Sequence, residues 1–147
     1  MPVGSVRHGT VPPREPGRGC YPHHELPEAQ AAGDDGHPVC WEGDISEPGF
    51  DFRRGCATLP DERHEPTQAD RQRAFEQFQT TDDHCMELFG LARDADGHLF
   101  FIAKNSWGTD NPYRGFMYLS YNYVRMKTIA IVVRNGEGKG IIVDSNG

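Results

Sequence analysis

"HCMELFGLARDADGHLFFIAKNSWG", residues 84–108, carries the strongest structural signal in the sequence. Two strand-like runs flank a polar segment in which Asp96 followed by Gly97 is a strong signal for a tight hairpin turn. Successive side chains of a strand point to opposite faces, so we expect His84 and Cys85 on different sides of the sheet. The stretch therefore predicts an antiparallel hairpin whose first strand opens with a histidine.

One helix and several further strands are expected around this hairpin. Pro66 and Thr67 suit a helix start, and helix formers continue to Gln79. The expected apolar face of this helix consists of Ala74, Phe75 and Phe78. Strands are expected in "HPVCWEGDI" (37–45), "GFMYLSYNYV" (115–124) and "KTIAIVVRN" (127–135), and a turn-rich loop in "SEPGFDFRRG" (46–55). The pattern indicates an α+β fold with a curled antiparallel sheet and one helix before the histidine-bearing strand.

The expected domain organisation is one folded lobe with a loose segment at each end. Residues 1–36 are rich in proline and glycine and lack periodicity, so we expect them to be poorly ordered. The folded lobe is expected to cover residues 37–135. The glycine-rich residues 136–147 are expected to form a flexible tail, with one extra strand as the alternative.

Composition and charge exclude several functional classes. Fifteen basic and 22 acidic residues give a net charge of −7, so the chain lacks the basic surface that nucleic-acid binding requires. The longest apolar run, residues 129–133, is too short to span a bilayer, and the N-terminus has no secretory signal, so we expect a cytoplasmic protein. The four cysteines have irregular spacing, and we expect them to be thiols.

Several motifs, in order, resemble one family of enzymes. "KNSWG" (104–108) followed by "RGFMYLSY" (114–121) resembles the segment around the active-site asparagine of papain-like cysteine peptidases. "TTDDHCM" (80–86), "YVRMKTIAIVV" (123–133) and "PVCWEGDISEPGF" (38–50) are similar to the bleomycin hydrolase or aminopeptidase C branch. The resemblance covers roughly residues 37–134. It implies the C-terminal lobe of a papain-like cysteine aminopeptidase, which acts on peptides without a cofactor.

The chemistry of such a peptidase explains the residue types in these motifs. A thiol nucleophile needs a base that holds it as thiolate, and the imidazole of His84 is suited to that role at neutral pH. An amide oxygen such as that of Asn105 can hold the imidazole in one tautomer and orientation. The resemblance implies that Trp107 covers the histidine–asparagine hydrogen bond, and Gly108 would let the backbone turn beneath it.

Each of these residues also has a plainer interpretation. A lone histidine at a strand start is commonly a surface or core residue. Asn105 alone would be read as a turn residue and Trp107 as core filler. We interpret Asp82 and Asp83 as a solvated turn rather than as part of a site.

The nucleophile of the resembled family has no counterpart in the sequence. That cysteine stands at a helix start after a glutamine, and no such segment is present. Cys40 lies in a predicted strand, where no helix N-terminus would lower its pKa, so we expect it to be a buried thiol and not the nucleophile. Cys85 should face away from His84, and Cys20 and Cys56 lie in no recognisable motif. We therefore expect the chain alone to be inactive.

Two functions and one kind of binding site follow as alternatives. The chain could be a peptidase lobe that works with a partner, either the missing N-terminal half or an intact relative. Alternatively, it could be a non-catalytic peptidase remnant that acts as an interaction module. Cys20 and His23 come close to a zinc-ligand spacing, but without a second pair, so we expect no metal site.

Overall fold

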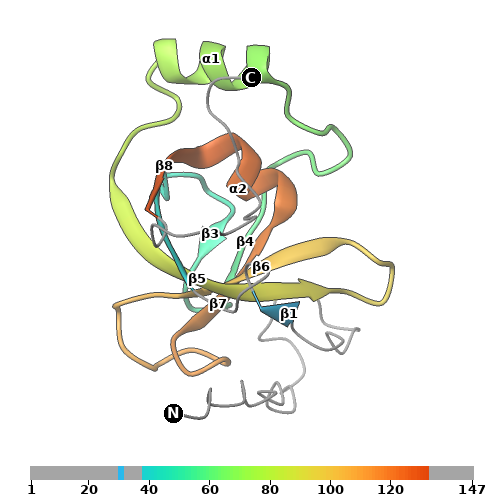
Figure 1. Cartoon of the computed structure of the whole chain (residues 1–147), viewed down its shortest axis with the longest axis vertical. Helices are drawn as coiled ribbons and strands as arrows, with labels where there is room; N and C mark the ends of the chain where they lie inside the picture. The colour runs from blue at the N-terminus through green and yellow to red at the C-terminus, as the bar shows by residue number, and fades with distance from the viewer. Residues whose placement is uncertain (1–29, 32–37, 133–147) are drawn as a thin grey trace, which may run out of the picture.

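The computed structural model describes residues 30–31 and 38–132 and shows a mixed α+β fold built on a curled sheet (Figure 1). The elements, in chain order, are β1 (Gln30–Ala31), β2 (Val39–Gly43), β3 (Phe50–Asp51), β4 (Cys56–Ala57), α1 (Gln68–Glu76), β5 (His84–Arg93), β6 (Leu99–Lys104), β7 (Phe116–Ser120), α2 (Tyr121–Lys127) and β8 (Thr128–Val132). The predicted α+β class with a curled sheet is confirmed.

The sheet has eight strands in the order β3-β4-β7-β6-β5-β2-β8, and β1 also pairs with β5. Its centre is the predicted antiparallel meander of β5, β6 and β7. Gly97 adopts a φ of 87° in the β5–β6 turn, a left-handed conformation that favours glycine. β4 pairs with β7 in parallel, so the expectation of a wholly antiparallel sheet is wrong at this edge. In Figure 1 the long β5 ribbon curves from the α1 end to the hairpin on the other side.

The strand that carries His84 lies between β6 and β2, and its pairing with β2 is tight at the histidine end. Gly43 of β2 stands directly opposite His84, and Trp41 stands opposite Met86. A Cβ atom on Gly43 would collide with the Trp41 ring and with the carbonyl oxygen of Lys127. Glycine at this position therefore allows the backbone of β2 to pass close to the tryptophan ring beneath it.

The curl of the sheet encloses the main hydrophobic core. Its buried members are Trp41, Ala57, Met86, Leu88, Phe101, Ala103, Met117, Leu119, Tyr123 and Val124. The alternation predicted for β5 is confirmed, because Met86 and Leu88 are buried whereas Cys85 and Glu87 are exposed. Trp41 is completely buried, and its indole nitrogen donates a hydrogen bond of 2.7 Å to Oγ1 of Thr128.

A second helix, α2, stands where the sequence predicted the end of a strand. Strand β7 stops at Ser120, whose hydroxyl oxygen accepts a hydrogen bond from the backbone N–H of Tyr123 and so caps α2. Tyr123, Val124 and Lys127 are the buried residues of the helix. Tyrosine and valine favour strands locally, but capping and burial of this face outweigh that preference. The expectation of a strand over residues 121–124 is therefore wrong, whereas α1 is the one helix expected before the histidine-bearing strand.

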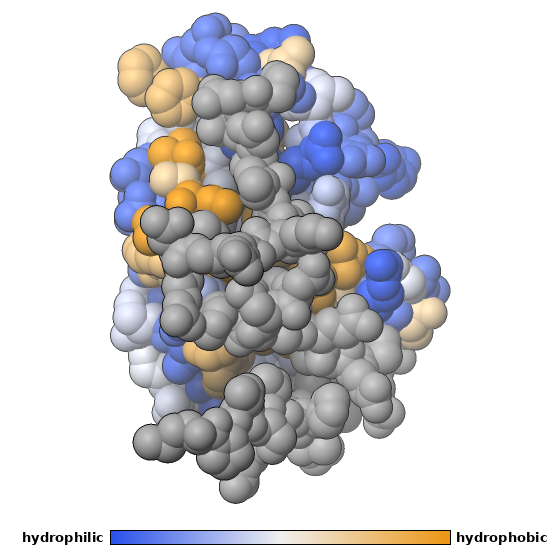
Figure 2. Space-filling model, in the orientation of Figure 1, coloured by the Kyte–Doolittle hydropathy of each residue, from blue (hydrophilic) through white to orange (hydrophobic). Residues whose placement is uncertain are grey.

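Helix α1 begins at the predicted cap but ends at Glu76, before Gln79. Of its predicted apolar face, only Ala74 is buried. The Thr67 hydroxyl caps the backbone N–H of Asp70, whose carboxylate accepts from the backbone N–H of Thr67 in return. Ala74 is buried, whereas Phe75 is 57% and Phe78 is 85% exposed, so the predicted apolar face is wrong at both aromatic residues. Figure 2 shows hydrophobic side chains at the surface near this end of the molecule.

Loop 46–55 and the segments at the two ends of the chain flank these elements. The predicted loop 46–55 contains β3 and leads into β4, which together extend the sheet. Gln30 and Ala31 form β1, which pairs antiparallel with β5. The rest of segment 1–36, apart from these two, and the predicted tail 136–147 lie outside the described residues. Neither helix of the described part is long and apolar enough to cross a bilayer.

Candidate functional site

The structure brings His84 and Asn105 together, as the hairpin predicted. His84 is the first residue of β5, and Asn105 directly follows β6, its antiparallel neighbour. The imidazole Nε2 of His84 lies 2.9 Å from Oδ1 of Asn105. Asn105 is only 2% exposed, so the hydrogen bond is anchored on a buried amide. Burial strengthens such a contact because water competes less for the donor and acceptor.

The contacts of the Asn105 amide define which way it points. Its Oδ1 also accepts the backbone N–H of Ser106 at 2.7 Å, and its Nδ2 donates to Sδ of Met117 at 3.7 Å. An amide oxygen only accepts hydrogen bonds, so Nε2 of His84 must carry the proton of this pair. In the neutral imidazole the other ring nitrogen, Nδ1, is then an acceptor.

Trp107 lies beside the imidazole at the surface. The centres of the two rings are 5.0 Å apart, and the ring planes are inclined by 46°. Trp107 is 48% exposed, so it is not core filler. Edge contacts with Phe50 at 5.9 Å and Phe52 at 5.5 Å hold the indole in place. Sequence reasoning missed these two phenylalanines, although their alternate spacing around Asp51 was a signal for a short strand.

Gly108 makes the backbone turn that the sequence predicted after Trp107. Its φ is 82°, and the φ of Gly115, at the other end of the same loop, is 86°. A Cβ atom on Gly115 would collide with the carbonyl oxygen of Gly108, so the two ends of the loop pack backbone against backbone. The backbone N–H of Asn105 donates to the carbonyl of Gly115 at 3.1 Å, which ties the asparagine to the loop.

The segment that precedes His84 in the chain is held by a buried carboxylate, that of Asp44. Asp44 is fully buried, and its Oδ2 accepts the backbone N–H of Thr81 at 2.8 Å. Its other oxygen accepts from both the backbone and the hydroxyl of Ser46 at 2.6 Å. The Nζ atom of Lys127 lies 3.8 Å from Oδ2. Sequence reasoning treated Asp44 as part of a strand end and gave no signal of its burial.

These contacts also set the protonation of Asp44. Burial alone would raise its pKa, but the hydrogen bonds from Ser46 and Thr81 and the charge of Lys127 together lower the pKa below its ordinary value. Asp83 is likewise structural in part, because its Oδ1 accepts the backbone N–H of Ile45 at 2.9 Å. The interpretation of Asp82 and Asp83 as an exposed turn agrees with their exposure.

None of the three described cysteines presents a thiol to His84. Cys85 is exposed, and the alternation along β5 places it on the face opposite to His84. Cys40 lies on the same side as Cys85, because the two Sγ atoms are 3.2 Å apart. Cys40 is a free thiol as expected, but it is half-buried and not fully buried. Cys56 is buried and disulfide-bonded, which corrects the expectation of a thiol there. Cys20 lies outside the described residues.

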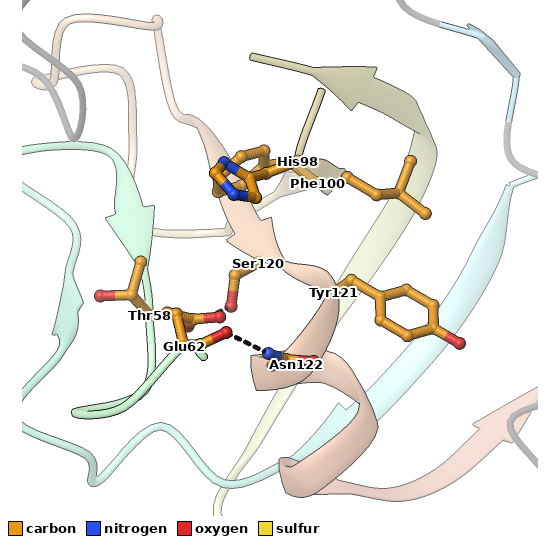
Figure 3. Close-up of a pocket in the computed structure, with 8 residues that line it drawn as sticks. Thr58, Glu62, His98, Phe100, Ser120, Tyr121 and Asn122 are labelled. Carbon is orange, nitrogen blue, oxygen red and sulfur yellow. Dashed lines mark hydrogen bonds between the residues drawn. The ribbon is translucent and has the colours of Figure 1, made fainter. Parts of the chain in front are cut away.

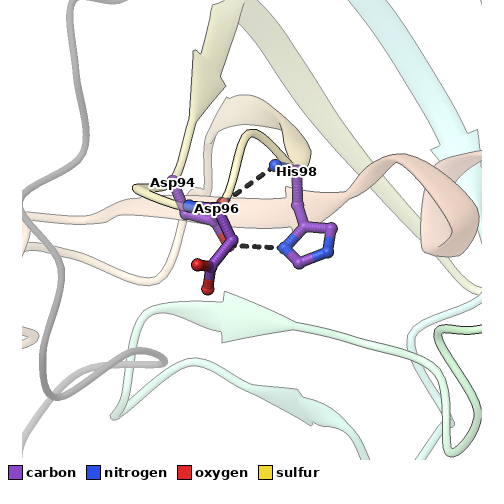
Figure 4. A group of neighbouring side chains, drawn as sticks. All are labelled: Asp94, Asp96 and His98. Atoms are coloured by element: carbon purple, nitrogen blue, oxygen red, sulfur yellow. Dashed lines mark hydrogen bonds and ion pairs between the residues drawn. The ribbon is translucent and has the colours of Figure 1, made fainter.

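Within residues 30–31 and 38–132, one group of side chains has the spacing of metal ligands. Asp94, Asp96 and His98 offer atoms within 4.8 Å of one another in the β5–β6 turn (Figure 4). Asp94, however, already accepts the backbone N–H groups of Asp96 at 3.0 Å and His98 at 2.8 Å. Its second oxygen lies 2.9 Å from Nδ1 of His98. This hydrogen bond and the charge of Asp94 raise the pKa of His98. The cluster organises the hairpin turn.

An open groove lies away from the residues of the candidate site. It is lined by Thr58, Glu62, His98, Leu99, Phe100, Ser120, Tyr121 and Asn122 (Figure 3). The polar groups in it mostly bind one another, since Oε1 of Glu62 accepts the Ser120 hydroxyl at 2.6 Å and the Glu62 carbonyl accepts the Asn122 amide at 2.9 Å. The groove therefore has no evident connection to the chemistry of His84.

The arrangement can hold a neutral imidazole with an accepting Nδ1 atom at a partly open surface. Such an imidazole can remove a proton from a thiol and later return it to a leaving amine. The described residues contain this imidazole and the amide that orients it, but no thiol that faces it. The scan against family models finds no match for this chain, and the search of curated proteins finds none either.

Proposed function

We propose that this chain is the lobe of a cysteine-type peptidase that supplies the catalytic histidine and its orienting asparagine. The observation that carries the proposal is the hydrogen bond of 2.9 Å between Nε2 of His84 and the buried Oδ1 of Asn105. The resemblance of the surrounding motifs to papain-like peptidases supports the same assignment. The finer attribution to the bleomycin hydrolase or aminopeptidase C branch rests on these motifs alone.

In this proposal the chain provides the base, and another polypeptide provides the thiol. His84 would take the thiol proton on Nδ1, and the imidazolium would then give it to the amine of the leaving peptide. Asn105 would keep Nε2 protonated and the ring oriented throughout. Trp107, which packs beside the imidazole, would limit access of water to the hydrogen bond.

The partner in this proposal is the missing N-terminal half of the peptidase, or an intact relative. The half-exposed Trp107, supported by Phe50 and Phe52, forms an aromatic surface next to His84 that a second lobe could cover. The substrate class is peptides, trimmed from the N-terminus as in the resembled branch, and the proposed location is the cytoplasm.

A second function follows from the same surface if no thiol is ever supplied. Among the described cysteines, Cys40 and Cys85 lie on the opposite side of the sheet from His84, and Cys56 is bonded. A lobe without a nucleophile could persist as an interaction module that docks on a peptidase through Trp107 and its neighbours.

A complementation assay distinguishes these functions. The full chain is mixed with the separately produced N-terminal half of a bleomycin hydrolase, which contains a nucleophilic cysteine, and hydrolysis of an aminoacyl-coumarin substrate is followed. We expect no turnover by either piece alone. The mixture should show turnover that an alkylating reagent abolishes and that His84→Ala removes. His98→Ala is the matched control, because that histidine lies in the β5–β6 turn and should leave turnover unchanged.

The other outcomes are equally informative. Binding of the two pieces without turnover would favour the interaction module over the catalytic lobe. Thiol-sensitive turnover by the chain alone, lost in His84→Ala, would show that one of its own cysteines is the nucleophile. If the mixture shows no binding and no turnover, the result argues against both functions.

A further inference from the structure

Two cysteines face each other across strands β2 and β5 on the outer side of the sheet. In the ladder Cys40 stands opposite Glu87, and Cys85 stands opposite Glu42, so the two cysteines are diagonal neighbours. Their Sγ atoms are nevertheless only 3.2 Å apart. Diagonal side chains of a flat ladder lie farther apart than directly opposed ones, so the twist of the sheet brings these two sulfurs together.

The surroundings of the pair favour a reaction between the sulfurs. A disulfide bond is about 2.05 Å long, so the two Sγ atoms, already 3.2 Å apart, need to approach by only about 1.1 Å. Between them in the ladder, Trp41 and Met86 stand opposite each other and point into the core. That buried pair fixes the register of the two strands. Cys85 is exposed and Cys40 half-exposed, so a soluble reagent can reach them.

We propose that Cys40 and Cys85 form a reversible dithiol–disulfide site that reacts with low-molecular-weight disulfides. The thiolate of one cysteine attacks a sulfur of the reagent disulfide, which releases one reagent thiolate and leaves a mixed disulfide on the protein. The second cysteine then attacks the protein sulfur of that mixed disulfide and releases the second reagent thiolate. Two protein thiols are oxidised, one reagent disulfide is reduced, and the two protons pass to the released thiolates.

The oxidised form would tie β2 to β5 next to the candidate site. Cys85 directly follows His84, and Gly43, which stands opposite His84, is three residues from Cys40. A bond at this point would fix the pairing of the strand that carries the histidine. This inference does not depend on peptidase activity, because it rests only on the two sulfurs and the ladder between them.

The test uses the full chain with oxidised glutathione as the probe. The chain is incubated without reductant, quenched with acid, alkylated and digested with endoproteinase Glu-C, which places Cys20 and Cys40 in different peptides. The peptides are then mapped by mass spectrometry. We expect a peptide pair linked through Cys40 and Cys85, with the loss of two hydrogens from the intact mass. In Cys40→Ser and in Cys85→Ser the second step is blocked, so the remaining cysteine should retain a stable glutathione adduct.

Two results would overturn the proposal. One is a wild-type chain in which Cys40 and Cys85 each keep a glutathione adduct, with no linked peptide. The other is a chain whose two thiols stay free under conditions in which the urea-unfolded chain is oxidised. If the linked peptide is found, circular dichroism before and after oxidation should show the same fold, because the core side of both strands is unchanged.

Discussion

Nε2 of His84 and Oδ1 of Asn105 lie 2.9 Å apart, although 21 positions separate the two residues in the sequence. The β5–β6 hairpin closes this distance, and the contacts of Oδ1 with Ser106 and of Nδ2 with Met117 orient the amide. A buried oxygen therefore faces the imidazole and defines its tautomer.

The hydrogen bond to Asn105 should fix the tautomer of the His84 imidazole. Neutral His84 should carry its proton on Nε2, because Asn105 offers only an acceptor on that side. Nitrogen-15 correlation spectra of the imidazoles at pH 8 should show protonated Nε2 and bare Nδ1 for this residue. In Asn105→Ala the preference should weaken to a mixture of tautomers. The His98 signals serve as the control, because that ring binds Asp94 and should not change. Protonated Nδ1 in the wild type would contradict the geometry.

The two tryptophans should respond very differently to a soluble quencher. Trp41 is completely buried, whereas Trp107 is 48% exposed. Acrylamide quenching of the wild-type fluorescence should therefore resolve an accessible and a shielded component. Trp107→Phe should remove the accessible component and lower the quenching constant several-fold. Equal quenching of the wild type and the variant would mean that Trp107 is covered in solution, for example by a second copy of the chain.

Asp44 should be among the most sensitive polar positions in the fold. In Asp44→Asn one carboxylate oxygen becomes an NH2 group that cannot accept, so either Thr81 or Ser46 loses its acceptor, which costs about 1–3 kcal/mol, whereas Lys127 keeps Glu47 at 2.9 Å. Urea unfolding at pH 7 measures this loss. The exposed Asp110→Asn is the matched control and should change stability by less than about 0.5 kcal/mol.

The effect of Asp44 should depend on pH in a defined direction. Its pKa in the folded protein is lowered, so the stability it contributes is present above its unfolded pKa and is lost as the pH falls through the lowered folded value. The difference between wild type and Asp44→Asn should therefore be largest near neutral pH and shrink in acid. A difference that grows below pH 4 would show that the carboxylate is not stabilised as described.

Two glycines with the same backbone conformation should differ in their tolerance of alanine. Gly97 has a φ of 87° and open space around its Cβ position, so Gly97→Ala should cost only the left-handed strain of about 1–2 kcal/mol. Gly115 has a φ of 86°, but its Cβ would also collide with the carbonyl of Gly108. Gly115→Ala should be more destabilising in urea unfolding, and equal losses would contradict the close packing of this loop.

The thiol pair should suppress the reactivity of Cys85 at neutral pH. The hydrogen bond with Cys40, followed by burial and the charges of Cys40, Glu42 and Asp82, raises the pKa of Cys85 to about 11. Its alkylation by iodoacetamide should rise about tenfold per pH unit up to pH 10 without a plateau, because only the thiolate reacts. Removal of the contact in Cys40→Ala should lower this pKa toward the ordinary value and increase the rate at pH 8. An unchanged rate would contradict the sulfur contact.

Local sequence signals were sufficient for the parts of the site that lie on the hairpin. The turn at Asp96 and Gly97 predicted the pairing of β5 with β6, and this pairing is what brings His84 to Asn105. Strand alternation correctly separated His84 from Cys85. Turns and alternation are properties of consecutive residues, so they can be read without knowing what packs against the strand.

The sequence by itself determined the α+β class, the central hairpin, the start of α1 at its Thr67 cap and the residues of the candidate site. Only the tertiary structure decided where α2 forms, whether Trp107 and Phe75 are exposed, how deeply Asp44 is buried and that Cys40 meets Cys85. The physical reason is the range of the interactions. Turn, cap and alternation act between near neighbours, whereas burial and diagonal contacts depend on which distant strands share an edge and how the sheet twists.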